Sequence, residues 1–201
     1  MKILNLYAGI GGNRKLWGDD HEITAVEYKP EIAKIYQDFF PKDKMVIGDA
    51  HQYLLEHFSE FDFIWSSPPC PTHSRVRFIA TYGHDGKIRQ KPVFPDMKLY
   101  EEIIFLKHYF KGKWVVENVV GYYEPLIVPQ EEGKHYFWAN FPIIQIKKQA
   151  RGHKYSIDNL AKIKGFDLGD IKGKRLLLRN CVEPGLGKYI LNCAINRATL
   201  F

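Results

Sequence analysis

The sequence is poor in cysteine and contains no long apolar run, internal repeat or low-complexity tract. Its three cysteines, Cys70, Cys181 and Cys193, lack Cys-x-x-Cys spacing, and their odd number argues against a disulfide framework or a zinc ribbon. The eight histidines are not clustered like metal ligands, so no metal site is expected. Since neither a signal peptide nor a transmembrane span can be recognised, we expect a cytoplasmic protein without a membrane partner.

The composition fits one globular domain with a sizeable core. Of the 201 residues, 45% are hydrophobic, and no linker-like stretch divides residues 1–201 into separate units. Lysine and arginine together number 29 against 23 acidic residues, which gives a formal net charge of +6. This modest excess is compatible with a nucleic-acid partner but does not identify one, so the positions of the basic residues are more informative.

Short apolar runs separated by helical patterns predict an α/β fold. The predicted strands cover residues 3–7, 23–26, 45–48, 61–65 and 113–116. Helices are predicted at residues 30–40 and 50–57, between the second, third and fourth strands. This β-α-β-α-β alternation indicates a doubly wound, mostly parallel and twisted sheet, whose ligands bind at the carboxyl ends of the strands. A later helix should bury Leu99, Ile103, Leu106 and Phe110 after a cap at Asp96.

Glycines and carboxylates follow the first three predicted strands. Residues 8–12 form a glycine-rich turn that should enter a helix and let a ligand approach the backbone closely. Glu27 and Asp49 come where the next two strands stop, and their carboxylates suit the hydroxyl or amino donors of a nucleoside. Because a glycine-rich turn alone is a weak signal, the two acids carry much of this prediction.

Cys70 and Glu117 form the candidate catalytic pair. Cys70 follows one apolar run, between Pro69 and Pro71, and Glu117 follows another. A lone cysteine is more often a small buried hydrophobe and a lone glutamate more often faces water, so each has a plain structural explanation by itself. Together at one sheet edge they offer a nucleophile and an acid.

Several ordered motifs resemble those of the DNA cytosine-C5 methyltransferase family and cover most of the chain. Residues 6–12 resemble the family's S-adenosylmethionine loop, Glu27 its ribose-binding acid and residues 48–49 its adenine-binding turn. The other matches are the nucleophile motif at 68–70, the glutamate motif at 117–119 and the final motif at 179–184. The resemblance implies a Rossmann-like methyltransferase fold with S-adenosylmethionine as the cofactor.

The resemblance also implies roles for individual residues. Catalytic roles are expected for Cys70, Glu117 and His135. Contacts with the cofactor are expected from Tyr7, Gly9, Ile10, Gly11, Glu27, Tyr28, Asp49, Ala50, Pro69 and Asn180. The sequence departs from the family where Gly133 and His135 replace an Arg-x-Arg pair and Pro71 replaces the usual glutamine. A histidine can still donate a hydrogen bond, whereas glycine offers no side chain.

The implied reaction is methyl transfer to C5 of cytosine in DNA through a covalent Cys70 adduct. Addition of the thiolate at C6 activates C5, while Glu117 binds N3 and the exocyclic amine. Because a free thiol is mostly protonated at neutral pH, we expect the site to favour the thiolate. The stacked target base must also be flipped out of the duplex.

Basic residues outside this centre are expected to contact DNA. Residues 71–95 are interpreted as a mobile basic loop that closes over the flipped base. The segment 142–178 is too short for an independent recognition domain and is interpreted as a reduced DNA-contacting segment, so specificity should be weak or supplied by a partner or a homo-oligomer. The expected nucleic-acid contacts are Ser74, Arg75, Arg77, Arg89, Lys147, Lys148 and Arg151.

Two alternatives stay open. One animal branch of the family methylates transfer RNA with essentially the same catalytic residues, and the missing recognition domain leaves that substrate open. Other animal relatives are non-catalytic regulatory modules, an interpretation that the retained Cys70 and Glu117 oppose and the lost arginine pair favours. The compact form resembles methyltransferases of phages and mobile elements, including restriction-modification systems, and thus indicates a bacterial or phage-infected host cell.

Overall fold

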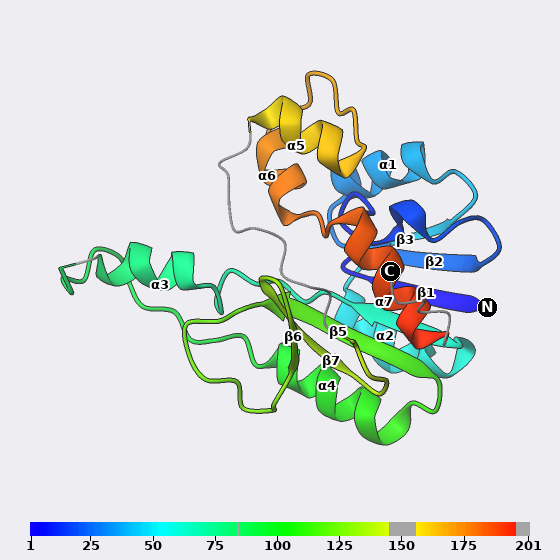
Figure 1. Ribbon diagram of the computed structural model, residues 1–201, viewed down its shortest axis with the longest axis horizontal. Helices are drawn as coiled ribbons and strands as arrows, with labels where there is room; N and C mark the ends of the chain where they lie inside the picture. The colour runs from blue at the N-terminus through cyan, green and yellow to red at the C-terminus, as the bar shows by residue number, and fades with distance from the viewer. Residues whose placement is uncertain (84, 145–155, 196–201) are drawn as a thin grey trace.

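A seven-stranded sheet lies at the centre of the computed structural model, which describes residues 1–83, 85–144 and 156–195 (Figure 1). In this part of the chain the strands are β1 Lys2–Leu6, β2 Glu22–Glu27, β3 Lys44–Ile47, β4 Phe63–Ser66, β5 Lys113–Val119, β6 Gln130–Glu132 and β7 His135–Ala139. Their order is β3-β2-β1-β4-β5-β7-β6, in which the first five are parallel and β7 is antiparallel to both neighbours. The predicted α/β fold with a mostly parallel sheet is confirmed.

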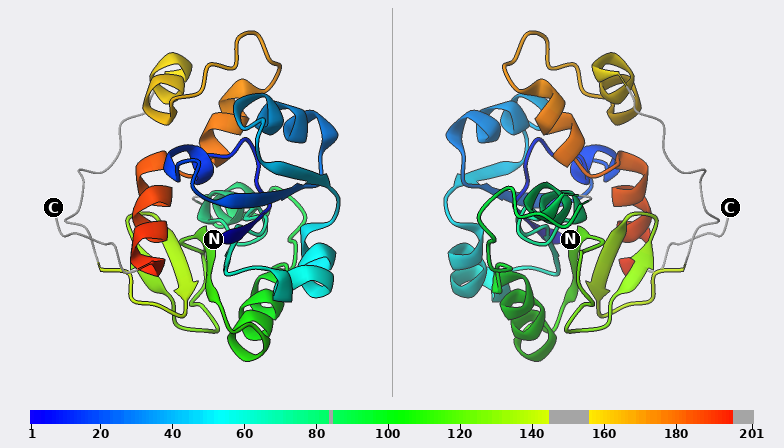
Figure 2. Two further views of the ribbon diagram at one scale, coloured as in Figure 1. Left: turned by 90° about the vertical axis from the view of Figure 1, so that its right-hand side faces the viewer. Right: turned by 90° about the vertical axis from the view of Figure 1, so that its left-hand side faces the viewer.

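Helices cover both faces of the sheet (Figures 1 and 2). One face packs against α2 Ala50–His57 and α4 Lys98–Tyr109. The other packs against α1 Pro30–Phe39, α7 Pro184–Ala194 and the 3-10 helix η1 Arg14–Leu16. The remaining described helices are η2 Phe58–Glu60, α3 Arg75–Tyr82, α5 Ile157–Lys164 and α6 Lys174–Asn180. None of the helices in the described ranges is long and apolar enough to cross a membrane.

The buried face of α4 follows the spacing expected from the sequence. Leu99, Ile103, Leu106 and Phe110 are each at most 7% exposed, which confirms their assignment to the core. The cap differs in detail, because Met97 is the N-cap residue and Asp96 Oδ1 accepts a hydrogen bond from the backbone N–H after it, at Lys98. Glu102 also lies on this face and is fully buried.

Two expected loops contain structure that the sequence pattern did not predict. The glycine turn leads into the three-residue η1 and not into an α-helix, since Trp17 follows directly and inserts into the core beside Trp65. Residues 71–95 are not a loop throughout, because α3 begins where Ser74 Oγ accepts the Arg77 N–H at 3.3 Å. Figure 1 shows α3 on an arm that projects from the body of the molecule.

Strand β5 is longer than predicted. It continues to Val119 because its antiparallel pairing with β7 extends as far as the pair Val119 and His135. Glu117 therefore lies inside the strand, 6% exposed, and does not follow it. The pairing of β5 with β7 fixes the direction of the Glu117 side chain more firmly than a loop would.

The glycine turn packs closely against the carboxyl-terminal part of the chain, and a stability prediction follows. A Cβ on Gly12 would lie 2.2 Å from Cys181 Sγ and 2.3 Å from the Val182 carbonyl oxygen. We expect Gly12→Ala to lower the free energy of unfolding by about 2 kcal/mol and the melting temperature by roughly 4–8 °C. Gly185→Ala is the matched control, because a Cβ there meets no atom within 4 Å. Thermal unfolding followed by circular dichroism tests this, and equal melting temperatures for the two variants would contradict it.

Candidate active site

The carboxyl ends of the five parallel strands form one edge of the sheet. The chain leaves β1 towards β2 and β3 on one side, and it returns to β4 and β5 on the other. In sheets with such a switch point, ligands bind between the loops that leave the two central strands. Here the loop after β1 holds the glycine turn and the loop after β4 holds Cys70. The two groups of residues singled out from the sequence therefore meet at one edge.

The turn after β1 depends on unusual backbone angles. Tyr7 and Gly9 both have φ of 55°, and Gly11 has φ of 83°. The Gly9 N–H donates to Glu27 Oε2 at 3.0 Å, which ties the turn to the end of β2. A Cβ on Gly9 would meet no atom within 4 Å, whereas one on Gly11 would lie 2.3 Å from the Phe40 ring. Gly9 thus borders open space, and Gly11 permits close packing on the residue that ends α1.

Two carboxylates flank this turn. Besides its bond to Gly9, Glu27 accepts the Lys29 N–H through Oε1 at 3.0 Å, so both of its oxygens are held in place. Asp49 Oδ1 accepts the N–H groups of His51 and Gln52 at 2.8 and 3.2 Å, which caps α2. Each carboxylate oxygen keeps a lone pair for a further donor.

The surroundings of these carboxylates fit the adenosyl part of S-adenosylmethionine. Tyr28 is 73% exposed next to Glu27, so its ring face is open to stacking by a base. Open space above Gly9 leaves room for a ligand beside the backbone. Of the other residues expected to bind the cofactor, Ile10 and Ala50 are buried, whereas Pro69 and Asn180 are exposed. Asn180 ends α6, one residue before the Cys181 that packs on the turn.

Cys70 lies in a loop that is fastened on both sides. Asn118 Nδ2, at the end of β5, donates to the Pro68 carbonyl at 3.0 Å. The Cys70 carbonyl accepts the N–H groups of His73 and Ser74 at 3.0 and 3.1 Å, which forms the turn into α3. The Cys70 side chain itself is half-buried. These bonds hold the loop that carries the thiol at the sheet edge.

Glu117 pairs with His135 across two antiparallel strands. His135 Nδ1 lies 2.5 Å from Glu117 Oε1. The bond forms because His135 is directly opposite Val119, two residues beyond Glu117 and on the same face of the sheet. His135, which stands where the family has an arginine, is thus in contact with Glu117, the candidate acid. One carboxylate oxygen is engaged by the imidazole and the other is available to a substrate.

The environment of Cys70 does not favour the thiolate, contrary to the expectation from the sequence. Burial raises the pKa of the Cys70 thiol, and the negative charge of Glu117 raises it further. This effect of Glu117 on the pKa of Cys70 means that the two side chains interact electrostatically. Removing the charge of Glu117, or adding a positive charge nearby, would therefore favour the thiolate.

With this arrangement established, comparisons with known proteins identify the family. A model described as C-5 cytosine-specific DNA methylase matches residues 1–104. The chain belongs to this family. Among solved structures, the chain is similar to DNMT2 of Spodoptera frugiperda, with 20% identity and a TM-score of 0.47 over 79% of this chain, and to a methyltransferase of Entamoeba histolytica, with 13% identity and a TM-score of 0.43 over 80%. It spans 59% of each of those two chains, and a search of curated protein sequences gave no match.

The methylase match covers the glycine turn, both flanking carboxylates and Cys70, whereas Glu117 and His135 lie beyond it. Membership of this family makes the α/β fold that of S-adenosylmethionine-dependent methyltransferases, as the sequence predicted. The contact of Glu117 with His135 and its electrostatic influence on Cys70 therefore come from the coordinates and not from the family match.

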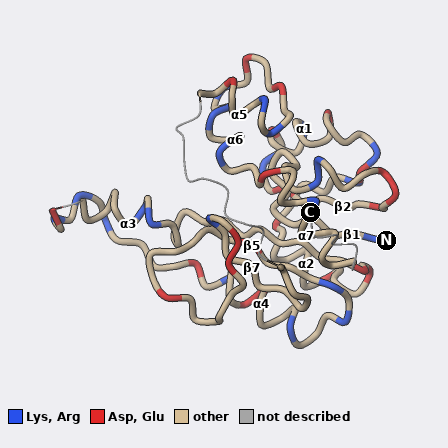
Figure 3. Tube along the Cα trace, in the orientation of Figure 1, with Lys and Arg blue, Asp and Glu red and all other residues tan. Residues whose placement is uncertain are grey.

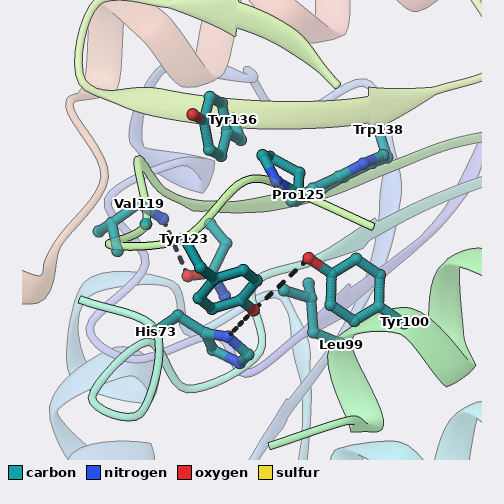
Figure 4. Close-up of a pocket in the computed structure, with 10 residues that line it drawn as sticks. His73, Leu99, Tyr100, Val119, Tyr123, Pro125, Tyr136 and Trp138 are labelled. Atoms are coloured by element: carbon teal, nitrogen blue, oxygen red, sulfur yellow. Dashed lines mark hydrogen bonds between the residues drawn. The ribbon is translucent and has the colours of Figure 1, made fainter. Parts of the chain in front are cut away.

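In this member of the cytosine methylase family, the loop after Cys70 is held against residues 121–123. The Arg75 guanidinium donates through Nε to the Gly121 carbonyl at 2.8 Å. His73 Nδ1 lies 2.6 Å from Tyr123 Oη (Figure 4). The Phe78 and Tyr122 rings stack with their centroids 4.7 Å apart, which fastens α3 as well. The base of the arm is therefore anchored to the loop that follows β5.

The basic residues expected to bind nucleic acid are arranged unevenly (Figure 3). Arg77 is exposed on α3, and Arg89 is exposed but lies 3.4 Å from Asp85 in an ion pair. The expected contacts at Lys147, Lys148 and Arg151 lie outside the described residues. The arm therefore offers cationic groups, although part of their charge is offset within the arm itself.

A small cavity beside His73 is not a substrate site. It measures about 10 Å³ and is lined by Leu99, Tyr100, Tyr123 and Trp138, among others (Figure 4). That space corresponds to about one water molecule. The cavity is therefore too small to hold a nucleobase.

Sequence reasoning missed Glu102, which the structure places beneath the site. It accepts hydrogen bonds from Tyr7, His51 and Ser66. A signal was present, because Glu102 comes three residues after Leu99 and four before Leu106, within the apolar stripe of α4. An acid at such a position requires buried donors, and that requirement points to a functional edge of the sheet.

Proposed function

We propose that the protein transfers a methyl group from S-adenosylmethionine to C5 of cytosine in DNA. The observation that supports this most directly is the grouping of Cys70 with the Glu117–His135 pair at the same sheet edge as the glycine turn. Membership of the cytosine methylase family supports the class of reaction. The choice of DNA rests on the description of that family and on the basic arm.

In this proposal Cys70 is the nucleophile. Its thiolate sulfur forms a bond to C6 of the cytosine, and the electrons of the C5–C6 double bond move to C5. C5 takes up the methyl group as the bond between that methyl and the sulfonium sulfur breaks, with S-adenosylhomocysteine as the leaving group. A base then removes the proton from C5, the double bond forms again and the thiolate leaves. Sulfur is returned unchanged, so Cys70 can act in successive turnovers.

Glu117 binds the Watson–Crick edge of the flipped base and also controls the thiol. Its Oε1 is engaged by His135, which leaves Oε2 for N3 and the exocyclic amine of cytosine. A proton taken up from solvent and shared between Glu117 and N3 removes the negative charge that raises the Cys70 pKa. Binding of the base and ionisation of the thiol then favour each other, which keeps the free enzyme unreactive.

S-adenosylmethionine supplies an electrophilic methyl group when it is bound. We assign the ribose hydroxyls to Glu27, the adenine to Asp49 and Ala50, and the stacking surface to Tyr28. The turn after β1 faces the rest of the ligand. The residues proposed there and around it are Tyr7, Gly9, Ile10, Gly11, Pro69 and Asn180.

The arm around α3 is proposed to bind the phosphate backbone of DNA while the target base is flipped out. Ser74, Arg75, Arg77 and Arg89 are the residues assigned to this contact. Flipping costs a few kcal/mol, which salt-dependent phosphate contacts help to offset. Binding should therefore weaken as the salt concentration rises.

The segment 142–178 is proposed to replace a larger recognition domain. Its described part contains α5 and the start of α6, which pack on the α1 side of the core through Phe166, Leu168 and Leu178. Two lysines there already donate to backbone carbonyls, Lys164 to Cys181 and Lys174 to Gly169. Because the segment is too short for an independent recognition domain, we propose short recognition sites or a specificity partner.

The substrate can be tested by incubating the protein with tritium-labelled S-adenosylmethionine and, separately, duplex DNA, single-stranded DNA and transfer RNA. We expect label in duplex DNA, and digestion to nucleosides should locate it at C5 of cytosine. Preferential labelling of transfer RNA would overturn the choice of DNA. Cofactor binding without transfer to any of the three substrates would contradict the catalytic proposal.

A further inference from the structure

Glu102 is a buried carboxylate that joins three separate parts of the site. It is 0% exposed. Tyr7 Oη donates to its Oε1 at 2.6 Å, and Ser66 Oγ donates to its Oε2 at 2.5 Å. His51 Nδ1 lies 3.1 Å from Oε1. The four residues come from α4, the turn after β1, the end of β4 and the first turn of α2.

Each donor lies next to a residue with a proposed role. Tyr7 begins the glycine turn, His51 follows Asp49 by two residues, and Ser66 is the last residue of the strand that leads to Cys70. Stability alone does not require this arrangement, because an apolar residue on α4 would complete the core without the desolvation of a carboxylate. The three donors converge on one group although their strands and helix are distant in sequence.

The bond to Tyr7 also offsets backbone strain. Tyr7 is the one non-glycine residue with positive φ in the described ranges, and such a conformation strains the backbone. Its hydroxyl is held by Glu102 at the far end of the ring. If Glu102 shifts, its hydrogen bond with the Tyr7 hydroxyl is lost. The glycine turn can then relax.

The charges around Glu102 keep it in place. Its hydrogen bond raises the pKa of His51, although burial of the imidazole opposes that change. Glu101 Oε2 also faces His51, 3.5 Å from Nε2, and Lys98 on the same helix repels its proton. Glu102 is therefore held by two hydroxyl donors and one imidazole.

We propose that Glu102 is a positioning residue that couples the cofactor turn to the nucleophile strand. This rests on the proposed function, in which the turn binds S-adenosylmethionine and Cys70 attacks the base. Loss of a donor on one side lets the carboxylate reorient and weakens its hold on the other side. Cofactor affinity and the placement of Cys70 therefore depend on the same buried group.

The test uses two single substitutions, each measured on the side of Glu102 that it does not touch. A change measured in this way is called a crossed effect. Ser66→Ala is measured by calorimetric binding of S-adenosylhomocysteine, and Tyr7→Phe by the rate at which iodoacetamide alkylates Cys70, with the site located by mass spectrometry. We expect binding to weaken about threefold in Ser66→Ala and alkylation to quicken about threefold in Tyr7→Phe, the size of one modest hydrogen bond. Ser59→Ala and Tyr109→Phe are matched controls on exposed residues and should change neither.

A third substitution tests whether Glu102 carries the coupling. In a Glu102→Gln background, the crossed effects of Ser66→Ala and Tyr7→Phe should shrink to within twofold, with Glu124→Gln, on an exposed residue, as the control. Crossed effects of undiminished size in that background would overturn the proposal. So would wild-type values in both single variants, and that comparison remains valid if Glu102→Gln does not fold.

Neither readout needs methyl transfer, so the two proposals fail separately. A protein that shows the crossed effects but labels no nucleic acid refutes the proposed reaction and leaves the coupling intact. A protein that methylates duplex DNA without crossed effects refutes the coupling alone.

Discussion

Replacing Cys70 by alanine is expected to abolish methyl transfer to duplex DNA, with a loss of at least about a thousandfold. Without the sulfur, no group can add at C6, and C5 stays too weakly nucleophilic to accept a methyl group. Binding of S-adenosylhomocysteine should stay within about twofold of wild type, because Cys70 contributes no hydrogen bond to the glycine turn. Initial rates of tritium incorporation and calorimetric binding measure the two effects.

Cys193→Ala is the matched control for this substitution. Cys193 is 5% exposed on α7, in the core away from the loop after β4, so the variant should keep its transfer rate. Transfer by Cys70→Ala at more than a tenth of the wild-type rate would contradict the covalent route. Equal losses in both cysteine variants would show that folding, and not the nucleophile, had been damaged.

The covalent step also has a direct test. Duplex DNA containing 5-fluorocytosine, incubated with the cofactor, should form an adduct that survives denaturing electrophoresis. Fluorine at C5 prevents the loss of a proton there, so the bond between Cys70 and C6 persists. Peptide mapping should locate the oligonucleotide on Cys70. An adduct on another residue would contradict the assignment.

The shared sheet edge of the candidate residues could be predicted because it follows from strand order and strand ends. The carboxyl ends of parallel strands share one edge, so Glu27, Asp49 and Cys70 had to approach one another once the alternation was recognised. Glu117 joined them because β5 is the parallel neighbour of β4, with Ser66 opposite Val116. The positions of these residues follow from the topology of the sheet, which the hydrophobic periodicity of the sequence predicts.

Features that depend on register and on buried charge could not be predicted in the same way. The contact of His135 with Glu117 depends on which residue of β7 faces Val119, and a shift by one residue would reverse the direction of His135. The raised pKa of Cys70 depends on how deeply the thiol is buried and where Glu117 points. Neither the register of β7 nor the surroundings of the Cys70 thiol can be predicted from a local sequence pattern.

Replacing Glu117 by glutamine is expected to have opposite effects on methyl transfer and on the reactivity of Cys70. Methyl transfer should fall by about 10²–10⁴, the usual contribution of a positioned acid, because glutamine cannot share a proton with N3 of cytosine. Alkylation of Cys70 in the free protein should become faster at neutral pH. The negative charge that raises the thiol pKa is gone, while burial still keeps that pKa above its ordinary value.

The sign of this second effect separates the charge of Glu117 from a general loss of structure. When the thiol pKa falls, the thiolate fraction at any pH below it rises, so the pH midpoint of iodoacetamide alkylation should move to lower pH. Alkylation at pH 7.5 should therefore be faster in Glu117→Gln than in the wild-type protein. Glu124→Gln, on an exposed residue, is the matched control and should alter neither readout.

Two outcomes would contradict this role of Glu117. Methyl transfer that stays within threefold of wild type would mean that another group binds the base. A lower transfer rate with an unchanged or higher alkylation midpoint would mean that the charge of Glu117 does not act on Cys70, and the proposed link between base binding and thiol ionisation would fall. The expected pair of results, slower transfer with a more reactive thiol, requires Glu117 to restrain Cys70 until a base arrives.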